Sequence, residues 1–353
     1  MKVKAIPEDF IVKEVLKVKP QEYGDYRLFL LRKKGLETEE AIRKLSEFLG
    51  IPERLFSYGG LKDKNAVTEQ FITLPAGVGH KKFHSPHLSF WPVGFLNEPL
   101  NPSLVKGNCF EILLRGAKLP DSERVEILME HGIPNYYGEQ RFTSTRKGKT
   151  FFQIIDNREL ALKFLFLPAS WENSRSRKGK KLFLEGNYRE ASKLLKGWRK
   201  KVTLYLMKNP RGFKEAFKLI PERELLFQAS IFQAYLFNRT VSRLIENQKG
   251  KKLLFKYRMG ILLYPLFPAK LPEKLPSYIP KNHGFYDELI KETGINEEWL
   301  IPFRQFFRHF NRKVILKPYE FSAVEREEGI RLNLFLPSGA YATNVIRFLY
   351  SAV

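Results

Sequence analysis

Short stretches in which hydrophobic and polar residues alternate lie toward the two ends of the chain. In Ile330–Leu336 every second residue is Ile or Leu, and the residues between them are Arg331, Asn333 and Phe335, which predicts a strand with one buried face. Four further stretches, rich in β-branched and aromatic residues and bounded by turn-forming residues, are also predicted strands: Phe10–Val18, Tyr26–Leu31, Thr68–Leu74 and Asn108–Arg115. We therefore expect the two flanks of the chain to form a sheet.

Helical periodicity dominates the middle of the chain. Over Arg223–Glu246, hydrophobic residues recur at steps of three and four, the spacing of one helix face. Shorter helices are predicted at Asn187–Lys196, Gly212–Ile220 and Glu39–Leu49, the last ended by Gly50 and expected to cover a sheet. Five prolines within Tyr264–Pro280 predict no regular element there. These patterns indicate an α+β fold with a mostly helical middle.

The distribution of charge indicates two domains. The 353-residue chain has a formal net charge of +23, and most of it lies in residues 149–308, which hold 32 basic and 15 acidic residues. Residues 1–148, with 23 and 19, and residues 309–353, with 6 and 4, are nearly balanced. We interpret residues 149–308 as a basic domain inserted into a discontinuous domain formed by 1–148 and 309–353. So strong a basic excess attracts polyanions, which makes nucleic acid the first expected partner.

Several classes of protein are excluded by composition. The single cysteine, Cys109, rules out a disulfide framework and a cysteine-based zinc site. We find no secretory signal, no apolar run long enough to span a membrane, and neither a P-loop nor a Gly-x-Gly-x-x-Gly motif. A cytoplasmic protein with no membrane partner is expected. His80, His84 and His87 have the spacing of metal ligands on a helix, but Pro86 interrupts such a helix, so we predict a loop and no metal.

Asp63 is the first candidate for chemistry. It lies in a predicted tight loop that follows Gly59 and Gly60 and leads into a strand, and the glycines allow close approach of the backbone. Lys62 and Lys64 flank it, and a nearby positive charge favours the ionised form of a carboxylate, which is the form that acts as nucleophile or base. The alternative is an ordinary solvated polar turn.

Two further groups of residues suit RNA. Asn135, Tyr137 and Arg141 combine an amide, a ring and a guanidinium, the groups that bind an unpaired base, although a turn packed by tyrosines is an equal alternative. Basic residues that could follow a phosphate backbone form two runs: Arg175, Arg177, Lys178, Lys180 and Lys181, then Arg199, Lys200 and Lys201. The charge excess of the middle segment favours a phosphate-binding surface over a merely solvated one.

These segments resemble the TruD family of pseudouridine synthases. The stretch Gly60–Gln70 is similar to the family's catalytic Gly-x-Lys-Asp-x-x-Ala-x-Thr-x-Gln motif at every fixed position. Further stretches that resemble family motifs, the third only loosely, are Pro7–Glu14, Pro134–Phe142, Ala229–Asn238 and Leu336–Arg347. The resemblance spans nearly the whole chain and is weakest over residues 149–222 and 247–308. Two positions depart from the family pattern: Tyr137 stands where Phe is frequent, and Phe348 where Glu is common.

The resemblance implies a fold and an activity. The fold is an α+β pseudouridine synthase catalytic domain, with a mixed or antiparallel sheet flanked by helices, and a mainly helical inserted domain that contributes to RNA binding. The activity is the conversion of uridine to pseudouridine, at uridine 13 in the D-arm of tRNA, with no cofactor and no protein partner. Asp63 is then the catalytic residue, acting at C1′ or C2′ of the ribose, and the expected substrate-binding residues are Phe10, Lys62, Asn135, Tyr137, Arg141 and Tyr341. The alternative function is a non-catalytic RNA-binding or RNA-folding protein that uses the basic insertion.

Overall fold

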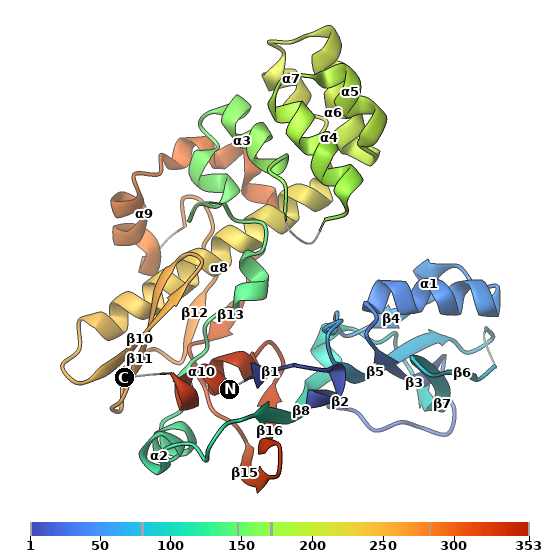
Figure 1. Ribbon diagram of the computed structural model, residues 1–353, viewed down its shortest axis with the longest axis vertical. Coiled ribbons are helices and arrows are strands. Elements are labelled where there is room, and N and C mark those ends of the chain that lie inside the picture. The colour runs from blue at the N-terminus through green and yellow to red at the C-terminus, as the bar shows by residue number, and fades with distance from the viewer. Residues whose placement is uncertain (1, 79–80, 147, 170–171, 283, 352–353) are drawn as a thin grey trace. The chain divides into compact units, whose positions relative to one another are not determined.

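The computed structural model describes residues 2–78, 81–146, 148–169, 172–282 and 284–351. The chain forms two compact units, which are described separately (Figure 1). Among the described residues, the sheet unit consists of residues 2–132 and 316–350, and the helical unit of residues 133–315 and 351. The sheet unit is thus discontinuous in sequence. No helix among the described residues has the length and the apolar character needed to cross a lipid bilayer.

The sheet unit is built on one mixed sheet. Its strands are β1 (Lys2–Val3), β2 (Phe10–Leu16), β3 (Tyr26–Lys34), β4 (Ser57–Tyr58), β5 (Val67–Pro75), β6 (Phe83–Ser85), β7 (Leu88–Leu96), β8 (Val105–Arg115), β15 (Glu320–Arg326) and β16 (Gly329–Pro337). Their order is β15-β16-β8-β2-β5-β3-β7-β6, with β1 paired to β8 and β4 to β5. β2 and β5 run parallel, and each pairs antiparallel with its other neighbours. The segments that precede β2 and β5 therefore meet at the same edge of the sheet.

The described part of the sheet unit contains the α-helices α1 (Thr38–Leu49), α2 (Ser122–Glu130) and α10 (Ala342–Tyr350). α1 covers the β5-β3-β7 part of the sheet, where it buries Ala41, Ile42 and Leu45 against side chains from these strands, among them the stacked pair Phe29 and Phe90 (Figure 1). α2 packs against α10, because the Arg124 guanidinium donates hydrogen bonds to the last carbonyls of α10. The amphipathic pattern predicted for residues 39–49 is confirmed, and Gly50 ends α1 with a φ of 68°.

The helical unit is organised around one long helix, α8 (Glu222–Glu246). Its other helices are α3 (Arg158–Leu165), α4 (Ser174–Leu184), α5 (Tyr188–Leu194), α6 (Gly197–Lys208), α7 (Phe213–Phe217) and α9 (Asp287–Thr293). Its short strands are β9 (Ile133–Pro134), β10 (Lys252–Tyr257), β11 (Gly260–Pro265), β12 (Lys274–Pro276), β13 (Asn311–Lys313) and β14 (Ile315–Leu316). α3 to α7 gather toward one end of α8, and the β10–β11 hairpin lies along the other (Figure 1).

The five predicted strands and four predicted helices are all present, with limits that differ by a few residues. Two local predictions were wrong. The region around His84 is not simply a loop, because β6 pairs with β7 as the last strand of the sheet; His80 lies outside the described residues. The proline-rich stretch contains β12, which pairs with β13 in a two-stranded sheet, where Pro276 at the strand end disturbs no central hydrogen bond.

Candidate active site

The loop that carries Asp63 connects β4 to β5 and packs closely against β8. A Cβ atom added to Gly59 would overlap the Val105 side chain, and Gly60 has a φ of 157°. The prediction that glycines permit a close approach of the backbone is confirmed at Gly59. The backbone at Gly59 therefore cannot move closer to the sheet. This limits the positions that Lys62 and Asp63 can take.

Buried polar side chains hold the loop in place. The Lys62 backbone N–H donates to Thr38 Oγ1 (3.0 Å), the Thr38 hydroxyl donates to Gln70 Oε1 (2.9 Å), and the Gln70 amide donates to the Gly60 carbonyl (3.2 Å). Thr38 and Gln70 are buried. This chain of hydrogen bonds joins the start of α1, strand β5 and the loop, so the Gln of the motif has a structural role in this fold.

The Asp63 carboxylate forms an ion pair with Lys4, and its Oδ1 accepts a hydrogen bond from the Asn65 N–H (3.0 Å). The side chain is 17% exposed, so it is neither sealed in the core nor freely solvated. The Lys4 ammonium also lies 4.0 Å from the centre of the Phe10 ring. Lys4 itself has a φ of 58°, a conformation that residues other than glycine rarely adopt. The sequence analysis did not identify Lys4 as part of this site.

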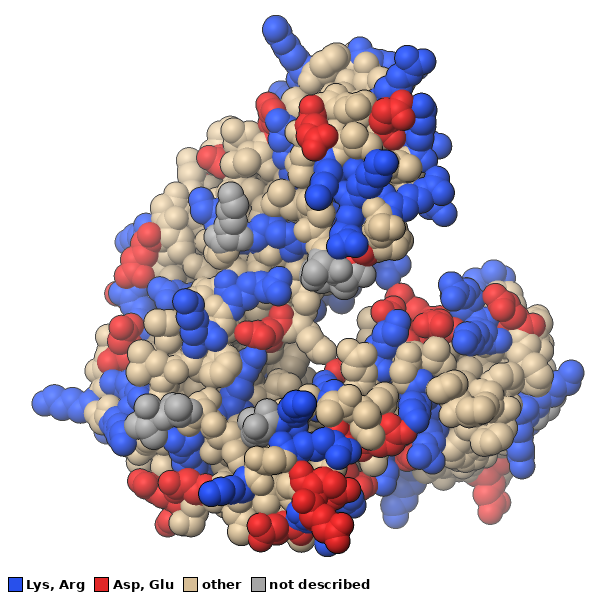
Figure 2. Space-filling model, in the orientation of Figure 1, with Lys and Arg blue, Asp and Glu red and all other residues tan. Residues whose placement is uncertain are grey.

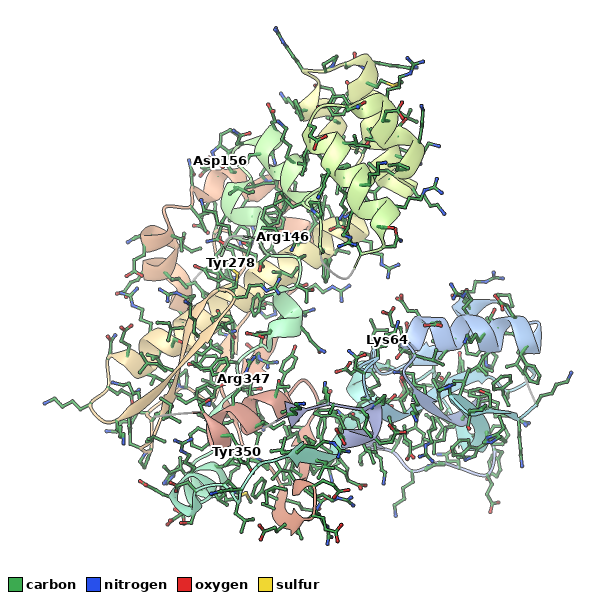
Figure 3. All side chains as sticks on the ribbon, in the orientation of Figure 1. Lys64, Arg146, Asp156, Tyr278, Arg347 and Tyr350 are labelled. Carbon is green, nitrogen blue, oxygen red and sulfur yellow. The ribbon has the colours of Figure 1, made fainter. Side chains whose placement is uncertain are left out.

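Lys62 does not supply the cation beside Asp63. Its ammonium contacts Glu14 Oε1 (2.6 Å) and Asn108 Oδ1 (2.7 Å), and its side chain is 11% exposed. Glu14 is buried, and its second oxygen accepts the Phe71 N–H (3.0 Å). This geometry does not favour the predicted contact of Lys62 with substrate, because its ammonium already binds Glu14 and Asn108 within the sheet unit. The neighbouring Lys64 is exposed (Figure 3).

Of the residues expected to line a uridine pocket, Phe10 and Tyr341 share the sheet unit with Asp63. Phe10 is 4% exposed and packs edge to face against Phe110, with 6.0 Å between ring centres. Tyr341 directly precedes α10 and is half-buried. Lys4 links Phe10 to Asp63 by contacting both.

The other predicted base-binding residues form a separate cluster in the helical unit. The Asn135 amide donates to the Lys313 carbonyl (3.1 Å), and its Oδ1 accepts from the Arg312 guanidinium (3.0 Å). The backbone of Tyr137 makes two hydrogen bonds with the Asn238 side chain, at 2.8 and 3.1 Å. The Arg312 guanidinium carbon lies 4.0 Å from the centre of the Tyr137 ring.

This cluster is buried and polar. Arg141 contacts the same tyrosine ring at 5.7 Å, so the structure brings Asn135, Tyr137 and Arg141 together. Arg312 and Asn238 were not predicted as parts of it. Asn238 ends the segment 229–238 whose resemblance to the family is only loose, whereas no sequence signal pointed to Arg312.

Most of the predicted phosphate-binding residues are exposed on α4 and α6, and Lys and Arg side chains cover much of this end of the helical unit (Figure 2). The exposed members are Arg175, Arg177, Lys178, Lys181, Lys200 and Lys201. The structure corrects two residues of this set. Lys180 is 4% exposed and ion-paired with Glu172, so its ammonium does not reach solvent. Arg199 is largely covered and lies against the Leu165 carbonyl and Glu224.

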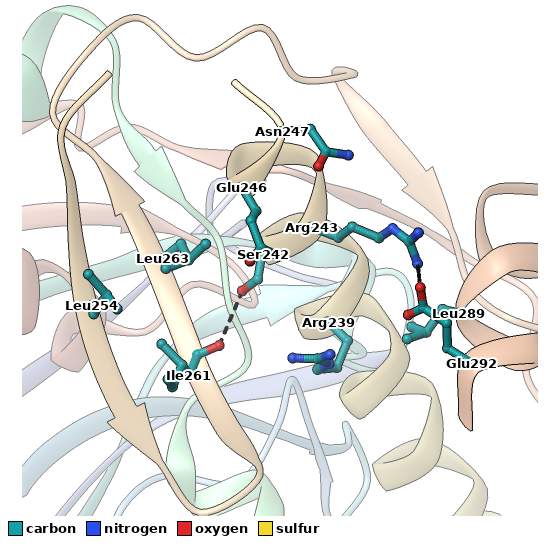
Figure 4. Close-up of a pocket in the computed structure, with 10 residues that line it drawn as sticks. All are labelled: Arg239, Ser242, Arg243, Glu246, Asn247, Leu254, Ile261, Leu263, Leu289 and Glu292. Atoms are coloured by element: carbon teal, nitrogen blue, oxygen red, sulfur yellow. Dashed lines mark hydrogen bonds and ion pairs between the residues drawn. The ribbon is translucent and has the colours of Figure 1, made fainter. Parts of the chain in front are cut away.

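A pocket of about 330 Å³ lies in the helical unit between α8, the β10–β11 hairpin and α9 (Figure 4). Two of its charged lining residues pair with each other, Arg243 and Glu292 (2.5 Å), and Arg243 also contacts Glu288 (3.0 Å). Within the described residues, no group of three or more His, Cys, Asp or Glu side chains is placed to hold a metal ion.

Comparison with known proteins identifies the family of the chain. Residues 1–254 match the family profile described as tRNA pseudouridine synthase D (TruD). The tRNA pseudouridine synthase D of Aquifex aeolicus is 27% identical over 384 residues, covering 99% of this chain and 98% of the relative. That of Leptospira interrogans (serovar copenhageni) is 26% identical, covering 98% and 95%.

A crystal structure assigned to tRNA pseudouridine synthase D (TruD) from Methanosarcina mazei has the same fold. It superposes with a TM-score of 0.68 at 22% sequence identity, over 99% of this chain and 93% of that one. The family match covers the Asp63 loop, the strands β4 and β5 that it connects, and most of the helical unit. The chain belongs to the TruD family of tRNA pseudouridine synthases.

Proposed function

We propose that this protein converts uridine to pseudouridine in tRNA, at uridine 13 of the D-arm, with Asp63 as the catalytic carboxylate. The observation that carries the proposal is the placement of Asp63 in a rigid loop, with its carboxylate partly exposed and paired with Lys4. The names of the relatives support the activity. The position in tRNA and the role of Asp63 rest on the resemblance of the Gly60–Gln70 motif to the family's catalytic motif.

The reaction explains why a single carboxylate is needed. The N1–C1′ bond of uridine breaks, the base turns, a C5–C1′ bond forms, and the proton lost from C5 is balanced by one gained at N1. The isomerisation changes no oxidation state. A carboxylate can attack C1′ as the first bond breaks, or remove a proton from C2′, and its negative charge stabilises the positive charge that develops on the sugar. The Lys4 ammonium favours the charged form of such a carboxylate.

The target base must leave its stack to reach Asp63, and aromatic side chains replace part of the stacking that is lost. Phe10 and Tyr341, which lie in the same unit as Asp63, are the candidates for this role. The exposed lysines and arginines of α4 and α6 would bind phosphates, an interaction that supplies affinity with little dependence on sequence. Lys180 takes no part in this surface because it is buried.

The test compares wild-type protein with Asp63→Asn, which keeps the shape of the side chain and removes its charge. Each is incubated with a tRNA transcript under single-turnover conditions, and pseudouridine is mapped chemically. We expect the variant to bind tRNA with unchanged affinity and to form no product. Asp25→Asn, an exposed turn residue of the same unit, is the matched control and should behave as wild type.

Two outcomes would contradict the proposal. Equal product from Asp63→Asn and wild type would remove Asp63 from catalysis. Binding of tRNA without any product from the wild-type protein would instead favour the non-catalytic RNA-binding alternative. A transcript in which uridine 13 is replaced by cytidine tests the position, because modification at another site would leave the yield unchanged.

A further inference from the structure

Lys33, the next-to-last residue of β3, is a buried lysine directly behind the Asp63 loop. Its residue surface is 1% exposed. Its ammonium donates hydrogen bonds to three backbone carbonyls, those of Leu36 (2.8 Å), Asp63 (2.9 Å) and Lys62 (3.2 Å). An ammonium has three donors, so these carbonyls use its full capacity. The side chain thus connects the turn before α1 to the loop that carries the candidate catalytic residue.

The three acceptors fix the geometry of Asp63 in particular. The carbonyls of Lys62 and Asp63 belong to the two peptide planes on either side of the Asp63 Cα atom. When both carbonyls are bound to one ammonium, the orientation of these planes is set, and with it the direction of the Cα–Cβ bond. Lys4 and Asn65 then act on the carboxylate itself. Backbone and side chain of Asp63 are therefore held by different groups.

Burial of a charged lysine is unfavourable, which makes this position unusual. Burial lowers the pKa of Lys33 from its ordinary value near 10.5 to about 8, while Asp63 and Glu37 act to raise it and Lys62 to lower it. Other charged or titratable groups near its strand line an adjacent pocket of about 300 Å³: Glu8, Arg32, Lys34, His84 and His87. The burial of the Lys33 charge is unfavourable, yet the side chain is retained in contact with the Asp63 loop. This combination indicates that Lys33 has a role in the candidate site.

We propose that Lys33 is a positioning residue of the pseudouridine synthase reaction, which orients Asp63 by holding both of its peptide planes, and which does not touch the RNA. The inference rests on the proposed role of Asp63. It predicts that loss of the ammonium slows the chemical step and leaves tRNA affinity unchanged. A misplacement of a reacting group by about 1 Å costs on the order of 100-fold in rate.

The experiment measures single-turnover rates at saturating tRNA, together with tRNA affinity, for Lys33→Met and for the control Lys34→Met. Lys34 is the next residue along β3 and its ammonium pairs with Glu8 rather than with the loop. For Lys33→Met we expect a rate lowered by roughly 100-fold and an affinity within about twofold of wild type. Lys34→Met should keep the wild-type rate. A purely structural role for Lys33 would instead leave the folded variant with the wild-type rate.

The pH dependence of the single-turnover rate supplies a second readout, and its wild-type arm needs no variant. As Lys33 loses its proton between pH 7 and 9, one hydrogen bond to the loop is lost, so the wild-type single-turnover rate should fall by up to roughly tenfold. The same decline should be absent in Lys33→Met. If Lys33 loses its proton in this range and the wild-type rate still stays constant to pH 9, the inference is overturned.

Asp63→Asn separates this inference from the proposed function. If Asp63→Asn forms no product and Lys33→Met reacts at the wild-type rate, the positioning role alone is wrong. If Asp63→Asn reacts at the wild-type rate, the catalytic role of Asp63 fails, and the role of Lys33 fails with it.

Discussion

The cost of keeping Lys33 charged inside the protein gives a prediction about stability. Its pKa is about 8 in the folded protein and near 10.5 when the chain is unfolded. Between these values the unfolded chain holds more protons than the folded one, so the free energy of unfolding must rise with pH. Each pKa unit corresponds to about 1.4 kcal/mol, and the gain between pH 7 and pH 10 is about 2 to 3 kcal/mol.

Urea denaturation of the wild type and of Lys33→Met at pH 7, 8, 9 and 10 tests this value. Other lysines also titrate in this range, but their contributions cancel when the free energy of unfolding of the variant is subtracted from that of the wild type. We expect this difference to move in favour of the wild type by about 2 to 3 kcal/mol over the range. Lys34→Met, whose side chain is not buried, should show a constant difference.

The result that would refute the reasoning is a constant difference for Lys33→Met as well. It would mean that Lys33 titrates at its ordinary value in the folded protein, so that burial imposes no penalty on its charge. The three carbonyl contacts would then fully compensate the loss of hydration.

Three further predictions concern other parts of the chain. Replacing Lys178 and Lys181 with Gln should reduce the slope of log affinity for tRNA against log salt by roughly 2, without changing the single-turnover rate at saturation; an unchanged slope would show that these residues are only solvated. Gly59→Ala should lower the free energy of unfolding by about 1 to 3 kcal/mol in urea denaturation, because its Cβ would overlap a side chain of β8; full stability would show that the loop can shift. The Arg115 guanidinium holds the pKa of Asp9 below its ordinary value of 3.8, so this pair contributes stability above pH 3.8 that is lost as the pH falls through the lowered pKa. In Asp9→Asn this contribution should be absent, so its free energy of unfolding, measured from pH 2 to 5, should fall less with decreasing pH than that of the wild type.

Local patterns were sufficient to predict much of the fold. The alternation in Ile330–Leu336 corresponds to β16, and the helix over residues 39–49 ends at Gly50, because both features depend on neighbouring residues only. The Asp63 loop was also found from local sequence, since glycines and a following strand are adjacent to it. Buried Lys180 was missed, although the periodicity of its helix contains the signal: Gly179, Lys180 and Phe183 share the buried face.

The cation beside Asp63 could not be predicted in the same way. Lys4 is 59 residues away in sequence, and only the parallel pairing of β2 with β5 brings the two segments to one edge of the sheet. Parallel pairing joins strands that are distant in sequence, and no local pattern specifies it. The flanking residue Lys62 looked the better candidate because it is adjacent to Asp63, but its ammonium extends to Glu14 instead. Adjacency along a loop says little about which side chains meet.

Three lysines thus lie in or next to the Asp63 loop, and they differ in burial and in the groups that they contact. Lys33 and Lys62 are almost fully covered and bind groups of the protein, the first backbone carbonyls and the second Glu14. The Lys33 ammonium is enclosed by three backbone carbonyls, two of which belong to the Asp63 loop. Lys4 is more exposed and touches both the carboxylate and the Phe10 ring. Of the three, Lys4 is therefore the lysine whose contacts would change if a uridine binds beside Asp63 as proposed, whereas the contacts of Lys33 and Lys62 are made inside the protein.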